Sequence, residues 1–158
     1  MADLAELEKR LNLVEAELQN LKDIDAICRI KYKYWRCLDK KLWDEMKECF
    51  SEDITTNYSD GKYRLNGPDE IIDFLRNRPG RDIHLSAHQG HHPEIELTGP
   101  TTATGVWALH DHVIDRYAGL TQNGGAHYYD EYVKQNGEWK IKHTGYTRIF
   151  EEKLFVNG

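Results

Sequence analysis

The sequence lacks any apolar run that approaches the roughly 20 residues a helix needs to cross a bilayer. Its N-terminus also lacks the apolar segment of a secretory signal peptide. Basic residues are in deficit, with 21 Lys and Arg against 27 Asp and Glu, and they form no basic stripe. This disfavours nucleic acid and anionic membranes as partners, and we expect a cytoplasmic protein.

Cysteine is scarce as well. The three residues Cys28, Cys37 and Cys49 all lie in helical pattern, and no two of them have the spacing of zinc ligands. An odd number of cysteines does not suit a disulfide framework. We therefore expect reduced, half-buried thiols and no bound metal.

The remaining composition is that of a globular chain. Hydrophobic residues make up 39% and charged residues 30% of the 158 positions, and there are no repeats, low-complexity tracts or linkers. This length fits a single core. We expect one domain over residues 1–158.

The N-terminal segment has a heptad pattern of apolar residues. Steps of three and four residues alternate along Leu4, Leu7, Leu11, Val14, Leu18 and Leu21. A stripe this narrow is typical of helix-to-helix packing. It could lie on its own domain, but we favour a subunit contact for the helix of residues 1–22.

Further helices are predicted downstream. Asp23 is a candidate N-cap for a second helix whose apolar face includes Tyr34. A third helix carries Leu42, Met46 and Phe50. Gly67-Pro68 opens a short fourth helix, which stops at Arg78-Pro79-Gly80.

The second half of the chain reads as strands. Ser59-Asp60-Gly61 is a hairpin signal between residues 54–58 and 62–65. Four long strands follow over 83–97, 102–115, 125–134 and 138–149, and Asn136-Gly137 joins the last two. Helices followed by antiparallel strands predict an α+β fold, with the helices on one face of a curved sheet.

Six of the eight histidines lie within two of these strands. They are His84, His88, His91, His92, His110 and His112. Histidine titrates nearer neutrality than any other side chain, so this region is a candidate for proton-transfer chemistry.

Strand alternation places Trp107, Leu109 and Asp111 on one face and His110 and His112 on the other. A carboxylate on an apolar face needs a hydrogen-bonding or charged partner, which makes Asp111 a candidate site residue. We expect His110 and His112 on the solvent side or at a subunit contact.

His84 and His88 share a face but lie about 13 Å apart at strand rise, too far to bind one zinc ion. A bulge at Gln89-Gly90 could aim His88 into a cavity. We interpret His91 and His92 as structural residues at a strand end.

Tyr34 and Asp39 lie upstream on the second predicted helix. Tyr34 continues its apolar face, so its hydroxyl can reach the interior, where it requires a partner. Asp39 lies near the helix C-terminus, where an anion is unfavourable, and could simply be a solvated acid.

Several stretches of the chain resemble SnoaL-like proteins and, among them, the bacterial bile-acid 7-alpha-dehydratases. The stretches are residues 34–39 (YWRCLD), 86–95 (SAHQGHHPEI), 102–111 (TATGVWALHD), 123–126 (NGGA) and 144–149 (TGYTRI). They keep their order and spacing over nearly the whole chain.

The resemblance implies a cone-shaped α+β barrel, with a curved mixed sheet around a deep apolar pocket, and a homotrimer. It implies a catalytic set of Tyr34, Asp39, His88 and Asp111. We also expect Trp107 and Leu109 to contact substrate.

These features predict a cofactor-independent dehydratase acting on a hydroxylated steroid or a similar small apolar polycyclic ketone. His88 would be the base, Asp111 would hold its ring, and Tyr34 would stabilise the oxyanion. Asp39 would orient the tyrosine or the leaving hydroxyl. The alternatives are a ketosteroid-type isomerase on the same fold and a non-catalytic ligand-binding oligomer.

Overall fold

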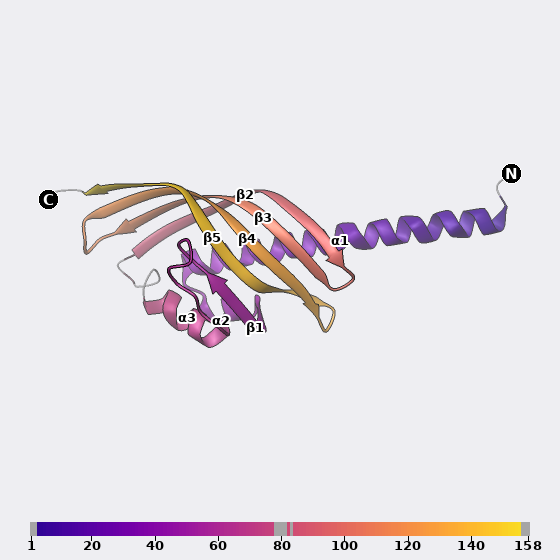
Figure 1. Cartoon of the computed structure of the whole chain (residues 1–158), viewed down its shortest axis with the longest axis horizontal. Coiled ribbons are helices and arrows are strands. Elements are labelled where there is room, and N and C mark those ends of the chain that lie inside the picture. Colours follow the sequence, from indigo (N-terminus) through magenta and orange to yellow (C-terminus); the bar gives the residue numbers. More distant parts are fainter. Residues whose placement is uncertain (1–2, 78–81, 83, 156–158) are drawn as a thin grey trace.

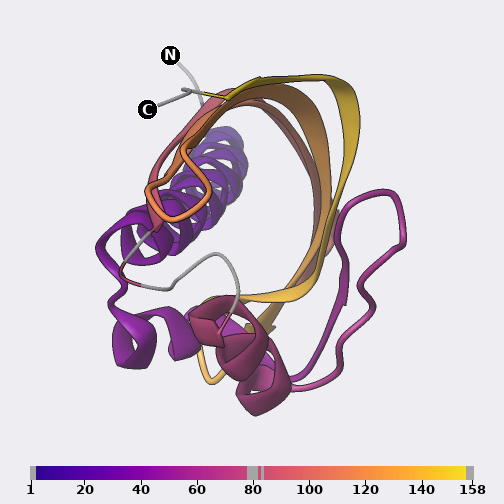
Figure 2. The ribbon, with the colours of Figure 1, turned by 90° about the vertical axis from the view of Figure 1, so that its left-hand side faces the viewer.

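A strongly curved sheet of five strands wraps around the inner half of one long helix (Figure 1, Figure 2). The computed structural model describes residues 3–77, 82 and 84–155. The elements are α1 (Leu4–Lys40), α2 (Trp43–Lys47), β1 (Phe50–Asn57), α3 (Pro68–Asn77), β2 (His84–Gly99), β3 (Thr102–Asp115), β4 (Leu120–Gln135) and β5 (Glu138–Phe155). The strand order is β1-β5-β4-β3-β2, with β1 parallel to β5 and the other neighbours antiparallel. The predicted α+β fold is confirmed.

The inner half of α1 supplies one side of the core. Its buried side chains recur at helical spacing, as Ile27, Lys31, Tyr34, Trp35 and Leu38 show. Trp35 meets Trp107 of β3 edge to face, with ring centroids 5.3 Å apart. Aromatic rings thus fill one end of the curved sheet, while α2 and α3 lie across its open side (Figure 2).

The predicted helix boundary at Asp23 is wrong, because α1 continues through it from Leu4 to Lys40. The Asp23 carboxylate instead accepts hydrogen bonds from Lys134 Nζ at 2.7 Å and Trp139 Nε1 at 2.8 Å. Burial raises the pKa of Asp23, but the hydrogen bonds that it accepts together lower the pKa by a larger amount. The pKa of Asp23 therefore lies below its ordinary value. Asp23 matched the sequence pattern of an N-cap, but its carboxylate binds the neighbouring sheet instead.

The strand predicted over 102–115 is confirmed as β3, while the other three run further than their sequence patterns indicated. The first, predicted over 83–97, is β2 and runs from His84 to Gly99; position 83 and the predicted helix stop at 78–80 lie outside the described residues. The third and fourth extend to Leu120 and Phe155. The turn at Asn136-Gly137 is confirmed, with φ of 52° and 83° as a type I′ hairpin requires. The second arm of the 59–61 hairpin makes only isolated bridges, one of them from Tyr58 to Tyr63.

Cys28, Cys37 and Cys49 are free thiols, as predicted, but they are buried rather than half-buried. Burial raises the pKa of Cys49 to about 12, so its thiol stays protonated at neutral pH. None of the helices in the described ranges has the length and apolarity to cross a membrane.

Lys31 and Asp130 form an ion pair in the core, and neither side chain is accessible to solvent. Lys31 Nζ lies 2.7 Å from Asp130 Oδ2, donates to Thr144 Oγ1 at 3.1 Å, and sits 4.0 Å from the ring centroid of Tyr128. Burial lowers the pKa of Lys31, while the adjacent carboxylate opposes that shift. Because each charge has lost its hydration, each depends on the other.

We predict that Lys31→Met lowers the free energy of unfolding by about 3–5 kcal/mol, because Asp130 is left buried without its counter-charge. Urea denaturation measures this loss. The matched control is Lys33→Met, which removes a partner of Glu48 from a pair whose side chains are 31% and 65% exposed. That loss is expected to stay below about 1 kcal/mol. Equal losses in the two variants would contradict the prediction.

Candidate active site

A cavity of about 610 Å³ opens between the concave face of the sheet, α3 and the end of α1. Its wall combines aromatic and aliphatic side chains with polar and charged ones. The lining residues are Leu38, Tyr58, Ser59, Tyr63, Phe74, Leu75, Asn77, His84, Ser86, His88, Asp111, Val113, Asp115, Gln122, Tyr146 and Arg148. The volume and mixed lining suit a small organic ligand, for which sites of roughly 300–1,000 Å³ are usual.

His88 in the cavity wall is paired with Asp39, the last acid of α1. His88 Nδ1 lies 2.6 Å from Asp39 Oδ1, and the backbone N–H of His88 donates to Oδ2 at 2.9 Å. Ser86 Oγ also donates to Oδ1 at 2.8 Å. An ionised carboxylate only accepts, so Nδ1 carries the ring proton and Nε2 is left as the basic nitrogen.

Strand alternation, rather than a bulge, aims His88 inward. The β2–β3 register is regular from His84 to His91, and its first shift lies between His91 and Glu94. The bulge predicted at Gln89-Gly90 is therefore misplaced. His92, at the actual irregularity, has a φ of 50° and is exposed.

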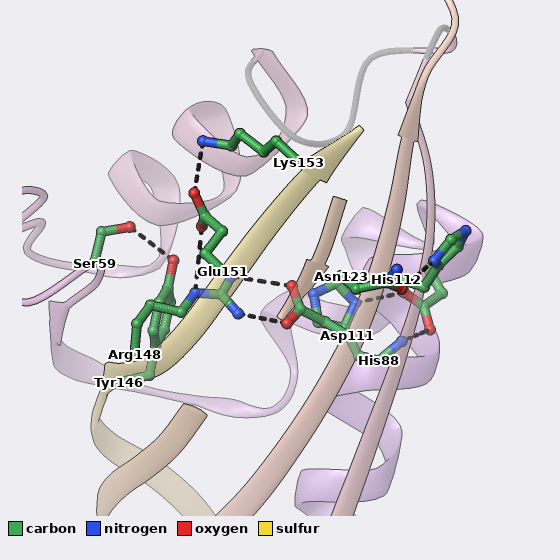
Figure 3. Close-up of polar contacts among 10 residues, drawn as sticks. Ser59, His88, Asp111, His112, Asn123, Tyr146, Arg148, Glu151 and Lys153 are labelled. Carbon is green, nitrogen blue, oxygen red and sulfur yellow. Dashed lines mark hydrogen bonds and ion pairs between the residues drawn. The ribbon is translucent and has the colours of Figure 1, made fainter. Parts of the chain in front are cut away.

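Asp111 lies opposite His88 in the β2–β3 register, but its carboxylate turns to Arg148 (Figure 3). Arg148 binds it with both terminal nitrogens, Nη1 to Oδ1 and Nη2 to Oδ2, the latter at 3.0 Å. Burial lowers the pKa of Arg148, but the hydrogen bonds and charge of Asp111 raise it above its ordinary value. The prediction that Asp111 holds the imidazole is wrong, and Asp39, predicted to orient the tyrosine or the leaving hydroxyl, contacts His88 and not Tyr34. Asp39 holds the ring.

Tyr34 reaches the interior as predicted, but behind the cavity wall. Its hydroxyl lies 2.9 Å from that of Tyr58, which does line the cavity. Burial raises the pKa of both phenols above the ordinary value, so both stay protonated. Tyr58 is thus the member of the pair that lines the cavity, and Tyr34 contacts its hydroxyl from the core.

A family model described as a SnoaL-like domain matches residues 19–145. The chain belongs to this family.

Solved structures show the same fold. A protein from Novosphingobium aromaticivorans, provisionally named a scytalone dehydratase, has a TM-score of 0.78 at 22% identity, over 88% of this SnoaL-like chain and 92% of its own. A hexachlorocyclohexane dehydrochlorinase, LinA type 2, gives 0.81 at 18% identity, over 87% and 93% of the two chains. The LinA type 3 enzyme from Novosphingobium barchaimii gives 0.80 at 18%, over 90% and 99%.

Trp107 and Leu109, predicted to contact substrate, lie in the core of this SnoaL-like domain and not among the cavity-lining residues. Their face was correctly assigned, since Asp111 and Val113 on the same face do line the cavity. Trp107 is covered by α1, and its Nε1 donates to Tyr132 Oη at 2.9 Å. Helix α1 therefore covers the concave face of the sheet at Trp107, whereas Asp111 and Val113, further along β3, face the cavity.

Of the other histidines, His84 also lines the cavity. His84 Nε2 lies 2.7 Å from Asp115 Oδ2. His110 is exposed on the outer face, and half-buried His112 bonds Asn123 at 2.6 Å. Over residues 3–77, 82 and 84–155, no three His, Cys, Asp or Glu side chains are grouped to hold a metal ion.

Gly124 of β4 makes room for the Asp111–Arg148 pair. A Cβ atom at this position would lie 2.6 Å from Asp111 Oδ1 and would also collide with Arg148 Nη1. Beside it, the β4–β5 register shifts between Gly125 and Ala126, a bulge that changes the alternation of β5. Arg148 and Tyr58 are the site residues that sequence reasoning missed, although Arg148 lies inside one of the quoted family stretches.

We predict that Gly124→Ala lowers the free energy of unfolding by about 1–3 kcal/mol, because the added methyl group forces the ion pair apart. Urea denaturation is again the measurement. Gly125→Ala is the matched control: its Cβ would lie 2.5 Å from the Phe150 ring, whose side chain is 47% exposed and free to turn outward. A larger loss in the control than in Gly124→Ala would count against this role for Gly124.

Proposed function

We propose that this SnoaL-like protein is a cofactor-independent hydro-lyase that removes water from a hydroxylated steroid or a similar polycyclic ketone, in the manner of a bile-acid 7-alpha-dehydratase. The observation that carries the proposal is His88 in the wall of a partly apolar cavity of about 610 Å³, with its ring paired to the Asp39 carboxylate. The names dehydratase and dehydrochlorinase, carried by proteins of the same fold, both denote eliminations and support it.

His88 is the proposed base. Its Nε2 takes a proton from the carbon next to the enone system, and the electron pair of that C–H bond passes into the conjugated carbonyl. Asp39, at 2.6 Å from Nδ1, stabilises the imidazolium that forms. This revises the catalytic set to one in which Asp39 does the work first expected of Asp111.

Tyr58 is the proposed donor to the substrate carbonyl. Negative charge develops on that oxygen as the dienolate forms, and a hydrogen bond from a protonated phenol stabilises it. Tyr34, at 2.9 Å, hydrogen-bonds to the hydroxyl of Tyr58 and fixes its direction. The carbonyl itself delocalises the charge, so the reaction needs no cofactor.

Loss of the hydroxyl completes the reaction. The dienolate electrons form the new C=C bond, the C–O bond breaks, and His88 returns its proton to the departing oxygen, which leaves as water. Arg148, neutralised by Asp111, provides a hydrogen-bond donor in the wall close to this position. Catalyst and protonation state are restored.

We also propose that the protein is a cytoplasmic homotrimer whose residues 1–158 act as one domain. Three free cysteines suit a reducing compartment. A trimer is what the resemblance to the bile-acid dehydratases implies, and the exposed outer half of α1 leaves an apolar surface for a subunit contact.

The proposed reaction is tested by incubating the protein with a panel of hydroxylated 3-oxo steroids and other polycyclic ketones. The masses of the products are then measured by mass spectrometry. We expect at least one substrate to lose the mass of one water. A product of unchanged mass with a moved double bond would make the protein an isomerase. Binding without any turnover would make it a ligand-binding protein.

We predict that His88→Ala lowers kcat on the substrate so found by about 10²–10⁴-fold, the usual contribution of general acid–base catalysis. His110→Ala, which removes an exposed imidazole from the outer face of the neighbouring strand, is expected to leave kcat unchanged. The near-UV circular dichroism of both variants checks that the fold persists. An undiminished rate in His88→Ala would remove this residue from the mechanism.

A further inference from the structure

Within the described residues, the apolar stripe on the outer half of α1 is left exposed. Figure 1 shows this part of the helix extending past the end of the sheet. Every residue from 3 to 22 is exposed. The stripe, here called the seam, is 47–70% exposed at Leu4, Leu7, Leu11, Val14, Leu18 and Leu21.

The domain holds α1 only from Asp23 onward. Asp23 is bound by Lys134 and Trp139, and the buried residues of the helix follow it. The projecting part, Leu4 to Lys22, is about 28 Å long at 1.5 Å per residue. Because most helical stability in proteins comes from packing of an apolar face, a partner helix on this exposed stripe would stabilise the segment.

The seam has the spacing of a coiled coil and complements itself. Leu4, Leu11 and Leu18 take the a positions, and Leu7, Val14 and Leu21 the d positions. A repeat of 3.5 residues keeps such a stripe facing an identical helix along its whole length. A second copy of the same seam is therefore the surface that matches it.

Charges beside the seam favour parallel helices. In a parallel pair, Arg10 faces Glu15 of a second copy, and Glu17 faces Lys22. The remaining flanking pair, Asp3 with Glu8, is repulsive but lies at the outermost turn. In an antiparallel pair aligned over the same seam, Glu8 instead faces Glu15 and Arg10 faces Glu17, so the repulsive and attractive pairs cancel.

We propose that residues 4–22 form a parallel coiled coil between copies of this chain, with the seam buried along its axis. This interface lies outside the cavity and does not depend on the proposed reaction.

The first test is the mass of the full-length chain in sedimentation equilibrium. Wild type is expected at a whole multiple, above one, of 18.5 kDa. Leu11→Lys places a charge in the seam and is expected to lower that multiple. Leu13→Lys is the matched control, because Leu13 is 57% exposed but lies off the seam. A monomeric wild type, or an unchanged mass for Leu11→Lys, would overturn the proposal.

The second test addresses helix direction. Leu11→Cys brings two thiols together across a parallel seam, and mild oxidation should link two chains on a non-reducing gel. The native cysteines are buried, and Leu13→Cys is the control for random collision. A lower assembly mass for Leu11→Lys, together with no cross-linking of Leu11→Cys, would mean that the seam packs on some other surface of a second copy. That result would contradict a parallel coiled coil.

Discussion

The carboxylate of Asp39 ties the end of α1 to strand β2, and the geometry of the site depends on this contact. An anion in the last turn of a helix is opposed by the helix dipole. Hydrogen bonds from Ser86, from the backbone of His88 and from its ring offset that cost. The same bonds fix the imidazole tautomer. The contact that joins helix to sheet is thus also the one that prepares the base.

Packing beneath this contact decides where the helix lies. Trp35 rests against Gly90, where a Cβ atom would overlap its ring, so the helix can approach β2 this closely only beside a glycine. Trp35 also meets Trp107 and Tyr128 edge on. The aromatic core therefore fixes the distance between the sheet and the end of α1 that carries Asp39. The cavity lies beyond these rings.

Much of the fold could be predicted because its signals are local. The turn at Asn136-Gly137 and the placement of Asp111 inward and His110 outward follow from dihedral preference and strand alternation. The partner of His88 could not, because Asp39 lies 49 positions away and two carboxylates competed for it. Arg148 was missed for a related reason: a bulge in the β4–β5 pairing interrupts the alternation that sequence reasoning relies on. The sequence pattern at Asp23 also gave a wrong prediction, because this residue binds the sheet from within α1 and does not start a helix.

The ion pair of Lys31 and Asp130 has a consequence for the history of this fold. Loss of either residue leaves the other charge buried without a counter-charge, whereas loss of both leaves a space that apolar side chains can fill. Intermediates with one residue changed are the unstable ones. Among related sequences, the two positions are therefore expected to vary together, with the ionic or the apolar combination inherited as a unit.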